Sequence, residues 1–162
     1  MRNLRDNKGF TLIEVLVVII IIGILSAIVI PRIATSTANA RQKADIATAH
    51  EVKAALDRYQ LENGAYPTSS DVSANGGNVS APKFIPKYIS KLEKATTQQN
   101  APEGKQGFGV AGLTANPSDS GHYMIPDTKT NTIMIYLTNN GAAAEVRVYD
   151  ENVENVLWTS AD

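Results

Sequence analysis

The sequence has no cysteine, only two histidines and no large excess of charge of either sign. The lack of cysteine excludes disulfide bridges, thiolate zinc sites, iron–sulfur clusters and cysteine nucleophiles. With 15 Lys and Arg against 16 Asp and Glu, the chain is not a polybasic nucleic-acid binder, and a hydrophobic content of 43% excludes global disorder. Its 162 residues are enough for about one domain.

The apolar residues are concentrated near the start of the chain. The run from Phe10 to Ile30 is interrupted only by Thr11, Glu14, Gly23 and Ser26. As a helix this run would be about 32 Å long, close to the thickness of a bilayer core. Residues 1–9 carry Arg2, Arg5 and Lys8 against Asp6, a basic excess that should hold this end in the cytoplasm. We therefore expect the rest of the chain to lie outside.

The apolar run allows three interpretations. An ordinary single-pass anchor explains its length but gives Glu14 no purpose. A secretory signal peptide would use Ala38-Asn39-Ala40 as the cleavage pattern before Arg41. Against this, the apolar region exceeds the usual length of about 7–15 residues and contains a carboxylate.

The third interpretation uses the features that the other two leave unexplained. The segment 8–14, Lys-Gly-Phe-Thr-Leu-Ile-Glu, precedes an apolar stretch with Gly23 and Pro31. This pattern resembles the class III leader and N-terminal helix of type IV pilins, and of the pseudopilins of type II secretion and competence systems. The resemblance implies that a prepilin peptidase removes a leader of residues 1–9 between Gly9 and Phe10 and then N-methylates Phe10. Gly9 suits such a site because it has no side chain to obstruct the enzyme.

Glu14 is the unusual residue of the apolar run. A charged group at the centre of a membrane helix costs about 2.5–3.5 kcal/mol on insertion scales, and less near an end. Glu14 can reach the headgroups by snorkelling. The pilin resemblance implies another role, in which Glu14 pairs with the Phe10 amine of a neighbouring subunit and sets the register of assembly.

A long helix is expected to continue beyond the apolar run. Residues 10–31 form its membrane or filament-core part, with a kink near Pro31 that the weak helix former Gly23 favours. Residues 32–63 form an amphipathic second half. A line of small and charged residues is expected to be an exposed neck, and a later apolar line is expected to be buried: Ala34, Ala38, Arg41 and Asp45, then Val52, Ala55, Leu56 and Tyr59. Asn63-Gly64 is a typical helix stop.

Residues 64–162 are expected to form a globular head. Its first part, 64–120, is rich in Ser, Asn, Gly and Pro and is interpreted as loops, apart from aromatic anchors such as Phe84 and Tyr88. Its second part, 121–160, contains strand-like runs at 122–125, 132–138, 144–150 and 153–159. The predicted fold is therefore α+β and pilin-like, with the second half of the helix packed on a three- or four-stranded antiparallel sheet.

The head offers no convincing catalytic or metal site. The G-x-G-x-x-G pattern at 107–112 lacks the strand before it and the helix after it that a dinucleotide site needs, so we interpret it as a loop. Calcium is not favoured at 127–131, where Lys129 replaces an acidic ligand, or at 150–152. His50 is expected to be a solvated surface residue. We expect no metal, no cofactor and no enzyme activity.

The sequence therefore favours a structural function. The preferred hypothesis is a pilin that waits in the cytoplasmic membrane with its head outside and then polymerises into an extracellular type IV pilus on the cell surface. The partners implied by the resemblance are further copies of the chain, the prepilin peptidase, an assembly ATPase and a membrane platform protein. One alternative is a pseudopilin of a type II secretion or competence system. An alternative of another class is a membrane-anchored or secreted ligand-binding module.

Overall fold

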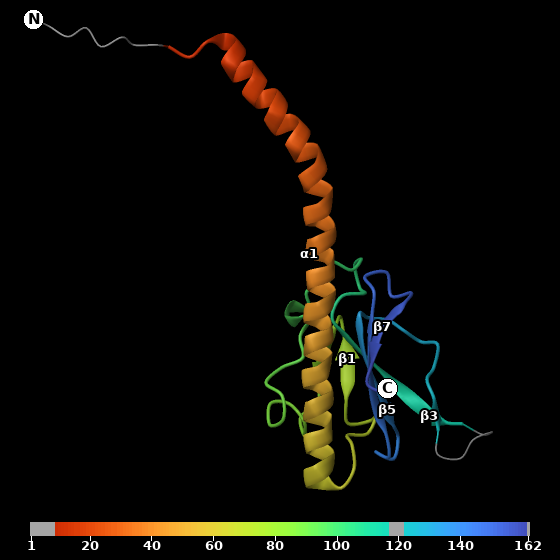
Figure 1. The fold of residues 1–162 in the computed structure, drawn as a ribbon. Coiled ribbons are helices and arrows are strands. Elements are labelled where there is room, and N and C mark those ends of the chain that lie inside the picture. The colour runs from red at the N-terminus through yellow and green to blue at the C-terminus, as the bar shows by residue number, and fades with distance from the viewer. Residues whose placement is uncertain (1–8, 117–121, 162) are drawn as a thin grey trace, which may run out of the picture. The chain divides into compact units, whose positions relative to one another are not determined.

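A computed structural model describes residues 9–116 and 122–161 (Figure 1). Of the predicted leader, only Gly9 falls among these residues. The chain divides into two compact units, Met1–Asn39 and Ala40–Asp162. The long helix α1, Leu12–Asn63, contributes residues to both.

In the first unit, α1 begins at Leu12 and passes through Gly23 and Pro31 without interruption. Figure 1 shows a gentle curve along this red and orange part of the helix. Proline lacks the N–H that would bond to the carbonyl of Ala27, four residues earlier, so one bond of the helical ladder is missing there. The helix therefore tolerates Pro31 as an irregularity within a continuous ribbon.

In the second unit, α1 carries a buried stripe made of Asp45, Ala49, Val52, Ala55 and Leu56. The spacing of three and four residues places these side chains on one face, which confirms the predicted apolar line. Asp45 is a correction, because it was expected in an exposed neck and has no exposed surface. The helix ends at Asn63 as predicted, and Gly64 has the positive φ of 78° that is typical of a helix stop.

The main sheet has five strands in the order β4-β3-β5-β6-β7. Their bounds are Phe108–Ala115 for β3, Tyr123–Met124 for β4, Ile133–Thr138 for β5, Ala144–Tyr149 for β6 and Val156–Thr159 for β7. Strand β3 runs parallel to β5, with Phe108 opposite Ile133, and all other neighbours are antiparallel. The four runs predicted within 121–160 coincide with β4 to β7.

The predicted α+β architecture is confirmed. The predictions that 64–120 consists of loops and that the sheet has three or four antiparallel strands were wrong, because the sheet has five strands and one parallel pair. Strand β3 lies in the glycine-rich stretch, and a small hairpin joins β1, Ser73–Asn75, to β2, Asn78–Ser80. A short 3₁₀ helix, η1, covers Lys94–Thr96. Glycine lowers strand propensity in general, but here it leaves room for neighbouring side chains, because a Cβ on Gly109 would displace the Met134 sulfur and the Thr130 hydroxyl.

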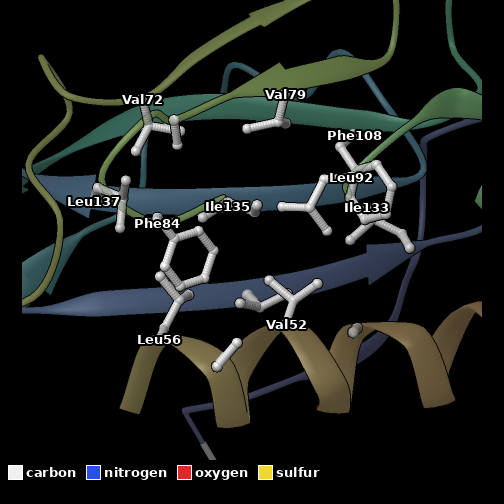
Figure 2. Packing of buried hydrophobic residues seen from close by; sticks show 14 of the residues in the cluster. Val52, Leu56, Val72, Val79, Phe84, Leu92, Phe108, Ile133, Ile135 and Leu137 are labelled. Atoms are coloured by element: carbon white, nitrogen blue, oxygen red, sulfur yellow. The ribbon is translucent and has the colours of Figure 1, made fainter. Parts of the chain in front are cut away.

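The core fills the space between α1 and the inner face of the sheet (Figure 2). Val52 and Leu56 of α1 point towards Ile135 and its neighbours on β5. Phe84, Tyr88 and Leu92 are buried in the same cluster, which confirms that the segment around them anchors to the core. The outer face of the sheet has its own buried cluster: Leu113, Met134, Tyr136, Tyr149 and Val153. Strand β5 is therefore covered on both faces, as its sequence predicted.

Candidate functional site: the start of the long helix

The described chain begins with Gly9 and Phe10, which precede α1 in a segment without regular structure. Both residues are exposed, and the Phe10 side chain exposes 86% of its surface. A Cβ built on Gly9 would meet no atom within 4 Å. The peptide bond between these two residues is therefore accessible within the described chain.

Thr11 and Glu14 close the N-terminus of α1 with reciprocal hydrogen bonds. The Thr11 N–H and the Thr11 hydroxyl both donate to Oε2 of Glu14 at 2.9 Å. In return, the Glu14 N–H donates to Oγ1 of Thr11 at 3.3 Å. This is a capping box, in which a Thr and a Glu three residues later satisfy main-chain donors that the first turn leaves without helical partners.

The capping box gives Glu14 a role within its own chain that the sequence analysis did not predict. The carboxylate lies in the first turn, where the positive end of the helix dipole also favours a negative charge. The signal was present, because Thr-Leu-Ile-Glu before an apolar run is the sequence pattern of a capping box.

Gly23 and Pro31 lie further along the same helix, so the structure does not bring them together with Glu14. Within this unit the helix after Pro31 is also locally weak. The Thr35 hydroxyl donates to the Pro31 carbonyl at 3.2 Å, and the Thr37 hydroxyl donates to the Ile33 carbonyl at 2.8 Å. Such side-chain bonds to the carbonyl four residues earlier compete with the helical ladder and often accompany bending.

The apolar side chains of this unit are exposed to an unusual degree. An 18-residue window within α1 has a mean hydropathy of 3.2 and none of its residues is buried. By length and composition this is the one helix among the described residues that can cross a membrane. Large aliphatic residues such as Ile19 and Ile24 expose 57% and 60% of their surface. A continuous apolar surface of this size needs lipid or other apolar helices to cover it.

In the head, the residues considered in the sequence analysis have structural partners. His50 is exposed as expected, yet the centroid of its ring lies 4.3 Å from the centroid of the Trp158 ring on β7. Asn131 is buried, and its amide donates to the Gln106 carbonyl at 3.1 Å. The Asp150 carboxylate accepts the Glu154 N–H at 2.8 Å and so closes the turn before β7. These groups support the fold.

The glycines of the G-x-G-x-x-G pattern at 107–112 have a role in packing. Gly107 has a φ of 98°, and a Cβ there would lie 2.5 Å from the Gly77 carbonyl oxygen. Gly109 and Gly112 lie inside β3, so the expectation of a loop at 107–112 was wrong. The start of β3 therefore packs directly on the backbone at Gly77, to which the Phe108 N–H donates at 3.0 Å.

Neither a metal site nor a deep ligand site stands out in the described parts of the head. Within 9–116 and 122–161, no group of three or more His, Asp or Glu side chains could hold a metal ion. An open hollow of about 650 Å³ borders Glu93 and Asn78. Glu93 pairs with Lys91 at 3.1 Å, and Oδ1 of Asn78 accepts the Lys94 N–H at 2.8 Å. The polar groups at this hollow are thus used within the fold.

Comparison with known proteins identifies the N-terminal feature. Residues 4–30 match the family described as the prokaryotic N-terminal methylation motif. The chain is 39% identical over 69 residues to type II secretion system core protein G of Vibrio cholerae, covering 43% of this chain and 47% of that protein. The corresponding protein of Pseudomonas aeruginosa is 42% identical over 65 residues, covering 40% and 46%.

A fimbrial protein of Neisseria meningitidis is 36% identical over 87 residues, covering 54% of this chain and 49% of that protein. The chain thus spans about half the length of the relatives that it matches. No solved structure matches it significantly. The relatives carry the names of a secretion-system core protein and a fimbrial protein, and neither name denotes an enzyme. The methylation motif and these relatives show that the N-terminal part of the chain is similar to pilins and pseudopilins.

Proposed function

We propose that the chain is a processed subunit that polymerises through its N-terminal helix into a pilus-like filament. The observation that carries this proposal is the exposed apolar part of α1, which lies largely within the methylation motif matched at residues 4–30. The bilayer covers this surface before assembly, and the helices of neighbouring subunits cover it in the filament. Before assembly the chain lies in the cytoplasmic membrane as a single-pass protein, with its head outside the cytoplasm.

Processing precedes assembly. A prepilin peptidase cuts between Gly9 and Phe10 and methylates the new Phe10 amine. The exposure of both residues, and the absence of any atom near a Cβ at Gly9, support access to this bond. A cytoplasmic ATPase and a membrane platform protein then drive insertion of the subunit into the filament.

Glu14 of one subunit pairs with the Phe10 amine of the next in this proposal. The capping box supports it, because it holds the carboxylate ready at the first turn of α1. On assembly the amine offers the carboxylate a full positive charge in place of main-chain donors, and burial among apolar helices strengthens that attraction. The stretch from Gly23 to Pro31 is where the helix adjusts to its neighbours.

A pseudopilus is the filament that the comparisons favour. The matched relatives in Vibrio cholerae and Pseudomonas aeruginosa are both named type II secretion system core protein G. A type IV pilus is the second candidate, since the match to the fimbrial protein extends over more of this chain, 87 residues. Disruption of the gene in its native cell distinguishes them. A pseudopilin mutant retains secreted proteins inside the cell, whereas a pilin mutant loses filaments that can be sheared from the surface.

The Glu14 pairing is tested by comparing Glu14→Gln with Thr11→Ala. Gln serves in a capping box as Glu does, so Glu14→Gln preserves the cap and removes the charge. Thr11→Ala preserves the charge and removes the hydroxyl of the cap. We expect Glu14→Gln to be processed and inserted into the membrane but to form no filaments by electron microscopy, whereas Thr11→Ala retains assembly. Normal filaments from Glu14→Gln, together with failure of Thr11→Ala, would show that Glu14 acts as a cap and not as an assembly charge.

A further inference from the structure

Three Asn-Gly pairs occur in the chain, at 63–64, 75–76 and 140–141. In each pair the glycine has a positive φ: 78° at Gly64, 57° at Gly76 and 69° at Gly141. Asn-Gly is the sequence in which the main-chain nitrogen of the second residue most readily reaches the side-chain carbonyl of the first, because glycine has no side chain in the way. The local sequence therefore permits attack of the glycine nitrogen on the asparagine side chain at all three pairs. The fold around each pair determines whether this attack can occur.

The first pair is held on both sides. The Gly64 N–H donates to the Gln60 carbonyl at 2.7 Å. The Asn63 amide nitrogen donates to the Tyr59 carbonyl at 2.8 Å and to the Tyr88 hydroxyl at 3.0 Å. Attack of the Gly64 nitrogen on the Asn63 side chain would break all three bonds, so the fold protects this pair.

The third pair is held in a similar way. The Gly141 N–H donates to the Thr138 carbonyl at 3.4 Å, and Oδ1 of Asn140 accepts the Ala142 N–H at 3.1 Å. Gly141 is also buried, and a Cβ there would lie 2.5 Å from the Tyr66 carbonyl oxygen. The glycine nitrogen and the asparagine carbonyl are both occupied, and the backbone has little room to move.

The second pair lacks the hydrogen bonds that hold the asparagine side chain and the glycine N–H in the other two pairs. Asn75 ends β1 and lies opposite Asn78 across the two-residue turn Gly76–Gly77. Asn75 and Gly76 are both exposed. Within the described part of the chain, neither the Asn75 side-chain amide nor the Gly76 N–H has a hydrogen-bond partner. We propose that Asn75 is a modification site, at which the folded protein undergoes spontaneous deamidation through a succinimide formed with Gly76.

The reaction requires only water. The Gly76 nitrogen gives up its proton and forms a bond to Cγ of Asn75, which closes a five-membered succinimide ring. The bond from Cγ to Nδ2 breaks, and the nitrogen leaves as ammonia with that proton. Water then opens the ring at one of its two carbonyls, to give either an aspartyl residue or an isoaspartyl residue in which the main chain runs through the former side chain.

The isoaspartyl product would change the packing of the hairpin. It lengthens the main chain by one carbon directly before a turn whose second glycine fits closely against β3. The Gly77 carbonyl accepts the Phe108 N–H at 3.0 Å, and Gly77 is buried against Gly107. Both products also add a negative charge to the exposed tip. Asn75 would therefore be the position at which an aged protein loosens the β1–β2 hairpin from the sheet.

The test is peptide mapping by mass spectrometry of the detergent-solubilised full chain, incubated at neutral and at mildly alkaline pH. We expect conversion at Asn75, faster at the higher pH, with Asn63 and Asn140 remaining as amides over the same period. In denaturant the three pairs should convert at similar rates, because the protecting hydrogen bonds are gone. Conversion of folded Asn63 or Asn140 as fast as Asn75, or an Asn75 that converts only in denaturant, would overturn the proposal.

Two variants test whether the product forms through a succinimide between Asn75 and Gly76. Asn75→Gln requires a larger ring and should abolish the conversion at this position. In Gly76→Ala the added Cβ meets no atom within 4 Å, although the φ of 57° strains an alanine at this position, and the methyl group hinders attack by the nitrogen. We expect Gly76→Ala to reduce conversion at Asn75 towards the level of Asn63 in the folded chain. Unchanged conversion in Gly76→Ala would contradict succinimide formation through Gly76.

Discussion

The carboxylate of Asp45, on α1, accepts a hydrogen bond from the main-chain N–H of Gln98 at 2.6 Å. Its second oxygen accepts the N–H of Gln99 at 3.2 Å. Asp45 has no exposed surface and Gln99 exposes 2% of its own. The Gln99 amide in turn donates to the Tyr149 carbonyl at 2.9 Å. The buried carboxylate therefore connects α1 to the loop that contains Gln98 and Gln99, and the Gln99 side chain connects this loop to β6.

Asp45→Asn should destabilise the head, because one main-chain N–H would then face an amide that also donates. Each buried donor left without an acceptor costs about 1–3 kcal/mol in the free energy of unfolding. Fluorescence of Trp158, the chain's one tryptophan, provides a readout because its ring contacts His50 of α1. Glu51→Gln is the control, since Glu51 lies on the same helix and is exposed. Equal unfolding midpoints for the two variants would contradict this role of Asp45.

The buried stripe of α1 predicts a contrast between two leucines of the same helix. Leu56 exposes 1% of its surface and Leu61 exposes 84%. Leu56→Ala should lower the free energy of unfolding by about 2–5 kcal/mol through lost burial and a cavity. Leu61→Ala should change it by less than about 0.5 kcal/mol. Denaturant titration of both variants measures the difference, and a comparable loss at Leu61 would mean that the predicted helix face is wrong.

The glycine-rich start of β3 predicts a second contrast. Gly107→Ala forces a Cβ to within 2.5 Å of the Gly77 carbonyl at a φ of 98°, so we expect a loss of roughly 1–3 kcal/mol or more. A Cβ on Gly112 meets no atom within 4 Å. Gly112→Ala should leave stability unchanged or raise it by about 0.4–1 kcal/mol. Thermal unfolding of the two variants measures this difference. If both variants melted at the wild-type temperature, the close approach of Gly107 and Gly77 would be contradicted.

Asp71 predicts a pH-dependent contribution to stability. The Thr68 hydroxyl, which donates at 2.6 Å, and then the Lys83 ammonium at 3.0 Å hold the pKa of Asp71 below its ordinary value. A lowered pKa in the folded state stabilises the fold above the ordinary pKa, and that contribution is lost as the pH falls through the folded value. Asp71→Asn should therefore melt below the wild type at neutral pH, with the difference shrinking below about pH 4. A difference that persists in strong acid would show that charge is not its cause.

The sequence was sufficient for much of this architecture because the decisive signals were local. The apolar run, the line from Val52 to Tyr59 and the stop at Asn63-Gly64 all belong to one helix, and β5 and β6 follow from their hydrophobic patterns. Strand β3 was missed because Gly107 and Gly109 pack closely against Gly77 and Met134, which are distant in sequence. Asp45 was missed for the same reason, since a carboxylate is buried only where donors from elsewhere in the fold meet it.

At the candidate site, both the choice of residues and the capping box depend on sequence patterns near the start of the chain. Gly9, Phe10 and Glu14 were selected by resemblance to prepilins, and residues 4–30 match the methylation motif. The bonds between Thr11 and Glu14 follow from a pattern that sequence alone could have supplied. The pairing of Glu14 with a neighbouring Phe10 involves a second chain and stays a prediction.

The measurement that tests the central claim most directly is the intact mass, with N-terminal fragmentation, of the chain purified from its native membrane or surface fraction. We predict a protein that lacks residues 1–9 and begins with N-methylated Phe10. A chain that retains Met1 would contradict processing and leave an ordinary membrane anchor. A chain that begins at Arg41 would contradict it in another way, because cleavage after Ala40 would remove the apolar helix on which filament assembly depends.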